Sequence, residues 1–171
     1  MAERTLVWAD PWEKARWLDA AATLDAAHPL VRSHARMLRT RAKNNAYQFA
    51  VLAHRFCRDR IKYQRDIGGE EFADSAAILT RGFDDCDGKS RLFVALCRAS
   101  GLPIAARIVP IFDKAGHFRH VQAECAVPGA PQELVQPNGW ILAELTLRGV
   151  ELGQGAESAR RDALTGRLDL A

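Results

Sequence analysis

Residues 82–103 read GFDDCDGKSRLFVALCRASGLP, an acidic loop followed by the most apolar helical segment of the chain. Five consecutive apolar residues, 92–96, lie in the middle of this segment. Gly101 and Pro103 are typical of a helix end, because glycine adopts the left-handed conformation and proline cannot continue a helix. We therefore expect a buried helix over residues 86–100, with Cys86 as its first residue.

The position of Cys86 suits a nucleophile. A helix N-terminus carries a partial positive charge and unpaired N–H groups, which favour a thiolate and the oxyanion of a reacting carbonyl. Asp84, Asp85 and Asp87 oppose this effect, because nearby carboxylates raise the pKa of a thiol, and Lys89 offsets only part of their charge. The site would therefore need a histidine partner. In the alternative reading, the aspartates only cap the helix and Cys86 is a small buried side chain.

Caps and apolar periodicity predict further helices before this segment. The predicted helices cover residues 11–27, 29–43, 45–61 and 75–80. Asp10 and Asp74 fit N-caps, and Pro11 fits the first helical position. No proline or glycine separates the second helix from the third, so one continuous helix over both is an alternative.

The pattern changes to strands after Pro103. Strands are expected over residues 104–112, 120–127 and 140–147, with a hairpin connection at 113–118 and a proline-rich loop at 128–138. Helices followed by an antiparallel sheet make an α+β fold. From residue 149 the chain is polar and glycine-rich, and we expect a tail that frays or holds one weak helix near 156–164.

The composition indicates one globular domain. The 171 residues suit a single core, with 48% hydrophobic and 26% charged residues and a net charge of +3. No apolar run is long enough for a membrane span, and no secretory leader pattern is present, so we expect a cytoplasmic location. No CxxC pair indicates a zinc site, and no cofactor or metal is expected. Three of the four cysteines are expected to be buried side chains, namely Cys57, Cys97 and Cys125.

Three motifs in order resemble a known family. The first is residues 82–103, followed by Arg107 on a strand. The second is residues 120–124, HVQAE, and the third is residues 139–146, GWILAELT. Together they resemble the core of the transglutaminase-like superfamily, with the resemblance running from about residue 47 to residue 146. We therefore divide the single domain 1–171 into an N-terminal helical extension 1–44, a core of about 45–148 and a polar tail 149–171.

The resemblance implies a papain-like fold with a catalytic triad. Carried over by position, Cys86 is the nucleophile, His120 the base and Glu144 the acid that orients the imidazole. Two departures from the family pattern bear on activity. Asp84 stands where the family usually has glycine, and Glu144-Leu145 replaces the usual aspartate and proline.

Other residues near the motifs have less specific roles. The backbone N–H of Cys86 and the side chain of Gln64, or of Tyr63, are candidate donors to an oxyanion. His117 is expected to be a solvated loop residue and the fallback base. Glu124 is expected to pair with Arg107 on the neighbouring strand, and Trp140 is expected to pack in the core.

Three functions are compatible with these motifs. The first is a thiol-dependent amide hydrolase acting on a protein or peptide, and the second is a transglutaminase, in which an amine replaces water. The third is a catalytically silent binding or assembly protein that retains the fold. The basic residues from Arg32 to Lys43 fit the exposed face of an amphipathic helix, so neither nucleic acid nor membrane is expected as a partner. The oligomeric state and the identity of the substrate stay open.

Overall fold

A computed structural model describes residues 10–155. Five α-helices are present in this part of the chain: α1 (Pro11–Asp25), α2 (Pro29–Arg41), α3 (Ala46–Asp59), α4 (Ser75–Arg81) and α5 (Cys86–Ala99). The strands are β1 (Lys62–Tyr63), β2 (Phe83–Asp84), β3 (Ala105–Phe112), β4 (Phe118–Ala126) and β5 (Ile141–Ala143). A short 3₁₀ helix, Gln132–Leu134, lies between β4 and β5. The α+β prediction is confirmed.

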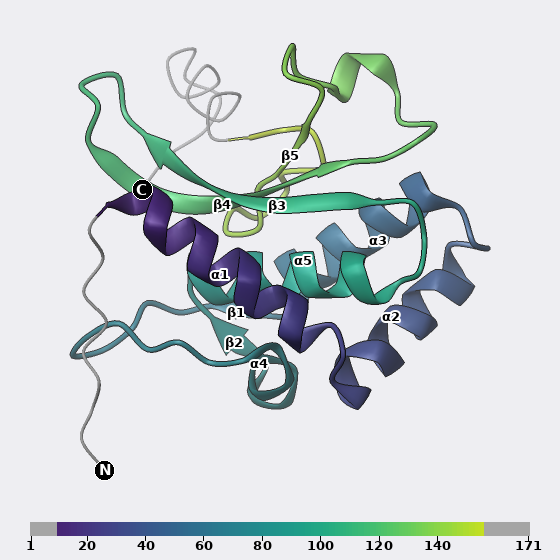
Figure 1. Cartoon of the computed structure of the whole chain (residues 1–171), viewed down its shortest axis with the longest axis horizontal. Helices are drawn as coiled ribbons and strands as arrows, with labels where there is room; N and C mark the ends of the chain where they lie inside the picture. Colours follow the sequence, from purple (N-terminus) through teal and green to yellow (C-terminus); the bar gives the residue numbers. More distant parts are fainter. Residues whose placement is uncertain (1–9, 156–171) are drawn as a thin grey trace.

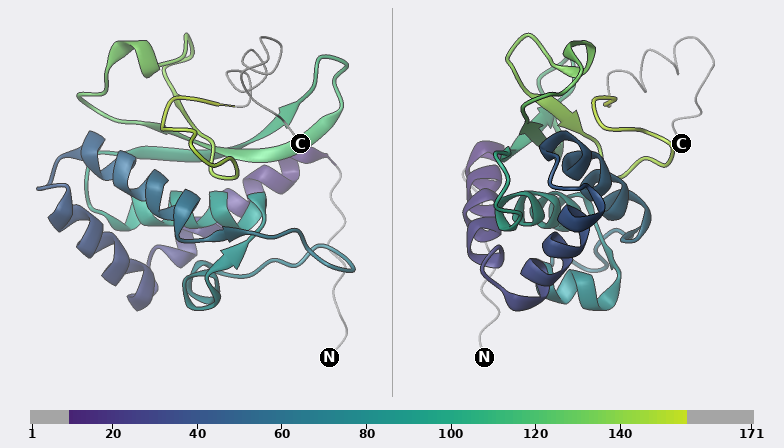
Figure 2. Two further views of the ribbon diagram at one scale, coloured as in Figure 1. Left: turned by 180° about the vertical axis from the view of Figure 1, so that it is seen from behind. Right: turned by 90° about the vertical axis from the view of Figure 1, so that its right-hand side faces the viewer.

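Helix α5 forms the centre of the molecule. Its residues 87–97 are all buried, and it contacts α1, α2, α3, α4 and the sheet strands β3 and β4. Figure 1 shows α5 beneath the sheet with α1 beside it, and the right-hand view of Figure 2 shows α5 enclosed by the other helices. This enclosure explains why the helix carries apolar residues on every side.

The main sheet is antiparallel, with the strand order β3-β4-β5. Arg107 of β3 lies opposite Glu124 of β4, and Ala123 of β4 lies opposite Ala143 of β5. The sheet lies across one side of the helices, so its inner face packs on α5 (Figures 1 and 2). The end of β4 that carries His120 and the chain that leaves β5 therefore lie near the start of α5.

The predicted helix starts are confirmed by their caps. The side chains of Asp10, Asn45, Asp74 and Asp85 each accept a hydrogen bond from a backbone N–H in the first turn of the following helix. The alternative of one continuous helix over α2 and α3 is wrong. Residues 43 and 44 adopt left-handed backbone conformations, with φ of 52° and 60°, and these break the helical hydrogen-bond ladder.

The structure differs from the prediction in the last strand and in a small second sheet. The third strand was expected to extend to residue 147, but β5 ends at Ala143. The chain turns there, because the Glu144 carboxylate accepts a hydrogen bond from the backbone N–H of Thr146 at 2.7 Å. Strands β1 and β2, which are too short to leave a periodic signal, form a separate parallel pair.

The hydrophobic core includes residues on both sides of the span that the motifs cover. Ala15 and Leu18 of α1 belong to the same buried cluster as α5, and so does Leu152 beyond residue 148. The backbone N–H of Gly153 also donates to the carbonyl of Leu142 at 2.8 Å. Residues 149–155 thus pack against the sheet, and the helix expected near 156–164 lies outside the described residues. None of the described helices is both long enough and apolar enough to span a bilayer.

Candidate active site

One cavity of about 250 Å³ brings the three predicted catalytic residues together. Its lining consists of Tyr63, Arg65, Cys86, Arg119, His120, Glu144, Thr146 and Leu147. Cys86 is the first residue of α5, His120 lies on β4, and Glu144 follows β5 directly. Segments that are far apart in the sequence therefore bring a cysteine, a histidine and a glutamate to one cavity.

His120 faces the carboxylate of Glu144. The His120 Nε2 atom lies 3.9 Å from Glu144 Oε2, too far for a hydrogen bond but close enough for an ionic contact with a charged imidazole. The Glu144 side chain is 2% exposed, and its other oxygen accepts from Thr146. Thr146 therefore holds one oxygen of the carboxylate, while the other oxygen faces the imidazole. In sites without substrate, catalytic hydrogen bonds are often this long and shorten when substrate binds.

His54 supports Glu144 from the core. Its Nε2 donates to the backbone carbonyl of Glu144 at 2.7 Å, and its ring is fully buried in α3. Burial lowers the pKa of His54 to about 4, so the ring is neutral at neutral pH and Nε2 carries the proton. Sequence analysis missed this residue. The only sign in the sequence was that a histidine stands within the apolar stripe of the helix. Such histidines also occur in protein cores where they have no role in a functional site.

The Cys86 thiol lies in an acidic environment. Its Sγ donates to Asp87 Oδ1 at 3.6 Å, and no hydrogen bond to His120 is present among residues 10–155. Burial raises the pKa of Cys86, and the carboxylates of Asp87 and Asp85 raise it further, while the Val121 N–H and Lys14 act in the opposite direction. The resting thiol is therefore protonated at neutral pH, and a base must remove its proton before it can react.

Asp85 is the cap of α5 and also titrates near neutral pH. Its Oδ1 accepts from the backbone N–H groups of Asp87 and Gly88, at 2.9 and 3.3 Å. Burial raises the pKa of Asp85 to about 7, and the charge of Asp87 contributes to this shift. The expected capping role of one aspartate is confirmed, and its charge changes in the physiological pH range.

Asp84 anchors the loop before the nucleophile. Its buried carboxylate pairs with Arg81 at 2.6 Å and accepts from the Asp85 N–H at 2.8 Å. A Cβ at Gly88 would lie only 2.2 Å from the Asp84 carboxyl carbon, so the first turn of α5 has room for this carboxylate only because residue 88 is glycine. Among the described residues, positive φ outside glycine occurs only at 43 and 44. Aspartate in place of the family's glycine therefore causes no backbone strain at residue 84.

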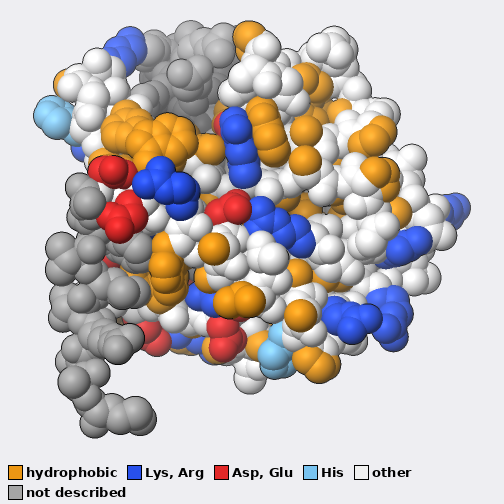
Figure 3. All heavy atoms as spheres, viewed as in Figure 1, with side chains coloured by type: hydrophobic (Ala, Val, Ile, Leu, Met, Phe, Trp, Pro, Cys, Tyr) orange, Lys and Arg blue, Asp and Glu red, His pale blue; other side chains and the backbone are white. Residues whose placement is uncertain are grey.

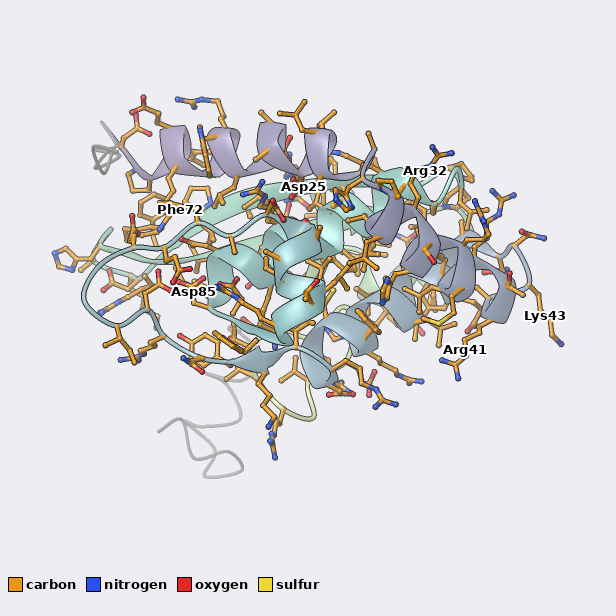
Figure 4. The ribbon with its side chains drawn as sticks, turned by 90° about the horizontal axis from the view of Figure 1, so that it is seen from below. Asp25, Arg32, Arg41, Lys43, Phe72 and Asp85 are labelled. Atoms are coloured by element: carbon orange, nitrogen blue, oxygen red, sulfur yellow. The ribbon has the colours of Figure 1, made fainter. Side chains whose placement is uncertain are left out.

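Lys14 of α1 provides a positive charge to Asp87, the residue after Cys86. Its Nζ lies 2.7 Å from Asp87 Oδ2 and also pairs with Glu70, and only 8% of its side chain is exposed. The ammonium lies 5.8 Å from the ring centroids of Phe72 and Phe118. Figure 4 shows Phe72 and Asp85 on the same side of the molecule. The N-terminal extension thus reaches the active site, which nothing in its sequence indicated.

The candidate oxyanion donors differ in position. Because Cys86 is the first helical residue, its N–H has no acceptor within the helix. Tyr63 lines the cavity, whereas Gln64 is exposed and is not part of the lining. The backbone N–H of Gln64 donates instead to the carbonyl of Asp84 at 3.0 Å. The oxyanion role of the Cys86 amide and of Gln64 stays a prediction.

The other residues singled out in the motifs lie outside the lining of this cavity. The Arg107–Glu124 ion pair is confirmed, with 2.9 Å between Nε and Oε2, and the Arg107 guanidinium lies 4.0 Å from the ring centroid of Trp140. Trp140 is therefore half-buried under an arginine rather than enclosed in the core. The His117 side chain is 76% exposed in the hairpin, as expected for a solvated residue.

The remaining cysteines are buried, and the carboxylates on either side of Cys86 already have bonding partners in the protein. Burial raises the pKa of Cys57 and of Cys125 to about 12, so neither is a nucleophile at neutral pH, and Cys97 is buried as well. Within residues 10–155, one group of three potential metal ligands has its donor atoms within 4.8 Å of one another, and it consists of Asp85, Cys86 and Asp87. The carboxylates of this group already serve as a helix cap and as the partner of Lys14.

Solved structures of other proteins match most of this chain. A crystal structure from Parabacteroides distasonis ATCC 8503, described as a "putative protease", matches 81% of this chain with a TM-score of 0.57 and 11% identity. A structure from Cytophaga hutchinsonii, described as a "putative cysteine protease", matches 80% with a TM-score of 0.39 and 20% identity. The chain spans only 27% and 48% of those two proteins. At such low identity, the first match supports the fold alone.

No curated protein matches the chain. The family model of the transglutaminase-like superfamily matches residues 33–145, which is about two thirds of the sequence. The match includes the first two motifs, the third except for its last residue, and the whole of α3, α4 and α5, and it leaves out α1. The chain therefore belongs to the transglutaminase-like superfamily.

Proposed function

We propose that the protein is a thiol-dependent amide hydrolase of the cysteine protease or peptidase type, with Cys86, His120 and Glu144 as its triad. The observation that carries the proposal is the single cavity lined by these three residues, in which the His120 imidazole faces the Glu144 carboxylate. Membership of the superfamily supports the same chemistry.

The proposed reaction begins with proton transfer from the thiol. His120 Nε2 faces Glu144, so Nδ1 is the nitrogen that accepts the Cys86 proton, and Glu144 stabilises the imidazolium. The sulfur then bonds to the carbonyl carbon of the substrate, while the backbone N–H of Cys86 stabilises the oxyanion. The C–N bond breaks, and the amine leaves with the proton from His120. Water attacks the thioester with His120 as base, which releases the acid and restores the thiol.

The acidic surroundings of Cys86 determine when the thiolate forms. Because burial, Asp87 and Asp85 raise the pKa of the thiol, a stable thiolate–imidazolium pair is disfavoured in the resting enzyme. The proton therefore moves to His120 as the sulfur attacks its electrophile, not in advance.

The first test is the rate of Cys86 alkylation by iodoacetamide across pH, with Cys86→Ala to identify the signal. We expect His120→Ala to slow alkylation by at least about tenfold at neutral pH, because it removes the base. Equal rates in the wild type and His120→Ala would mean that no thiol–imidazole partnership exists. In that case the alternative of a catalytically silent protein would be favoured, in agreement with the Sγ–Asp87 contact.

Hydrolysis and transamidation differ only after the acyl-enzyme has formed. Release of fluorescent peptides from labelled casein reports hydrolysis, and incorporation of a dansyl-amine into casein reports transglutaminase activity. We expect release without incorporation, and loss of release in Cys86→Ala. Incorporation that exceeds release would assign the protein as a protein-glutamine acyltransferase instead.

A further inference from the structure

A second cavity of about 450 Å³ adjoins the active-site cavity. It is lined by Arg58, Asp59, Lys62, Tyr63, Lys89, Thr146 and Arg148. Tyr63 and Thr146 line both cavities, so the second cavity begins where the cavity of Cys86 ends. A substrate held at Cys86 can therefore extend into it without crossing the protein interior.

Cationic side chains dominate this second cavity. Its lining contains four of them and one carboxylate, Asp59. The Arg58 guanidinium already binds that carboxylate through two contacts of 2.7 Å. The face of the molecule that carries α1, in contrast, mixes acidic and basic side chains (Figure 3). Arg58 also pairs with Glu151 at 3.3 Å. Two carboxylates thus oppose four cations, and the second cavity keeps a local excess of positive charge.

Two of the cations are free to bind a ligand. Within residues 10–155, the side chains of Lys62 and Arg148 form no hydrogen bond or ion pair, and both are exposed at the cavity. Lys89 lies at the base, 1% exposed, and its Nζ donates to the carbonyls of Arg58 and Ile61 at 3.1 and 2.6 Å. Its charge is fixed there and is not neutralised by a contacting carboxylate.

The active-site cavity continues the same charge pattern. Arg65 and Arg119 line it, and Arg119 is held by Asp113 in the hairpin while Arg65 has no ion-pair partner among the described residues. Three cations without an ion-pair partner among the described residues, Arg65, Lys62 and Arg148, therefore line the two adjoining cavities. Such a group of cations favours a negatively charged ligand and disfavours a positively charged one.

We propose that this second cavity is a subsite for a carboxylate-bearing segment of a peptide substrate, next to the amide bond that Cys86 attacks. The proposal rests on the hydrolase function proposed above and adds the substrate class. The carboxylate comes either from Asp or Glu side chains or from the C-terminus of the peptide. Lys62 and Arg148 bind it directly, and Lys89 contributes its buried charge from below.

The test measures peptide binding to the Cys86→Ala protein, in which no reaction follows. Four fluorescein-labelled peptides of one length are compared by anisotropy at low salt: Glu-rich, Gln-rich and Lys-rich peptides with amidated C-termini, and the Gln-rich peptide with a free C-terminus. We expect the Glu-rich peptide to bind more tightly than the amidated Gln-rich one, and the Lys-rich peptide to bind most weakly. If only the free C-terminus increases affinity, the subsite recognises a terminal carboxylate.

Charge-reversal variants test whether the peptide binds in the second cavity. Lys62→Glu and Arg148→Glu should each weaken binding of the Glu-rich peptide by about fivefold, the effect of one partly exposed ion pair. Arg41→Glu changes the net charge equally, but Arg41 lies at the opposite end of the molecule from Asp85 (Figure 4), so it should leave the affinity unchanged. Equal binding of the Glu-rich peptide and both Gln-rich peptides, or equal losses in all three variants, would overturn the subsite. Tighter binding of an oligonucleotide than of any peptide would also overturn it.

Failure of the subsite and failure of the hydrolase function give different results. Binding is measured without the thiol, whereas the function is tested by alkylation of Cys86 and by its dependence on His120. An inert Cys86 together with charge-dependent peptide binding would reject catalysis and retain the carboxylate site. A reactive Cys86 without charge-dependent binding would reject only the substrate class. Because Lys62 and Arg148 are exposed, both variants should unfold at the wild-type temperature, which a thermal melt checks.

Discussion

The side chains around Cys86 show how a few charges control one thiol. The N-terminus of α5 and the amide of Val121 favour the thiolate, but burial and the two adjacent carboxylates have the larger effect. Asp85 combines two roles, because its Oδ1 caps the helix and its charge disfavours ionisation of the neighbouring thiol. Asparagine at this position would retain the first role and remove the second.

We predict that Asp85→Asn increases the rate of Cys86 alkylation by iodoacetamide at pH 8 by about three- to tenfold, because it removes a charge that raises the pKa of the thiol. The pKa of Asp85 is about 7, so below pH 6 the wild-type carboxyl is protonated and the two rates should converge. The control is Asp74→Asn, the same exchange at the cap of α4, which should leave the rate unchanged. A variant no faster than the wild type at pH 8 would contradict this account.

At the scale of secondary structure elements, α1 extends the site beyond the part that the family model matches. The model begins at residue 33, yet Lys14 of α1 lies 2.7 Å from Asp87 and lowers the pKa of Cys86. The helix is held in place by the apolar contacts of Ala15, Leu18 and Ala22 with the core. Its position therefore couples the N-terminal extension to the chemistry of the thiol.

We predict that Lys14→Met slows alkylation of Cys86 at pH 8 by about three- to tenfold, because Asp87 then raises the pKa of the thiol without opposition. The double variant Lys14→Met/Asp87→Asn removes both charges and should restore most of the rate. Mass spectrometry of the alkylated peptide gives the rate at Cys86 alone. A single variant and a double variant that react equally slowly would show that Lys14 acts through packing rather than through its charge.

At the scale of the whole molecule, buried polar groups connect the helices to the sheet. His54 of α3 holds the backbone of Glu144, and Arg91 of α5 binds Asp25 of α1 through contacts of 2.6 and 2.9 Å. Each of these groups depends on its partner, since an unpaired polar group in the core is costly. Global stability should therefore respond to the protonation of such groups.

We predict that acidification from pH 6.5 to 4 costs the wild type up to about 3 kcal/mol relative to His54→Gln. The pKa of His54 is lowered from 6.5 to about 4 in the folded protein, so in this range the unfolded chain binds a proton that the folded chain excludes. Glutamine retains an N–H donor and does not titrate. Urea unfolding at several pH values measures the difference, and His117→Gln in the exposed hairpin is the control. A pH-independent difference between the wild type and His54→Gln would refute the prediction.

The sequence by itself determined the order of the helices and of the strands in the main sheet, and the start of each helix. The reason is that caps and apolar periodicity act within one or two turns, so the caps Asp10 and Asp74 could be assigned without knowledge of the fold. The same local signals placed Cys86 at the start of α5, and the order of the motifs predicted that His120 and Glu144 lie beside it, as the shared cavity shows.

Only the tertiary structure decided which groups surround the thiol and how they are protonated. Lys14 precedes Cys86 by more than seventy residues, and His54 precedes Glu144 by ninety, so no local pattern connects the members of either pair. The packing of residues 149–155 and the second cavity also arise from such distant contacts. Burial sets the pKa values of Cys86, Asp85 and His54, and burial is a property of the assembled core rather than of any single segment.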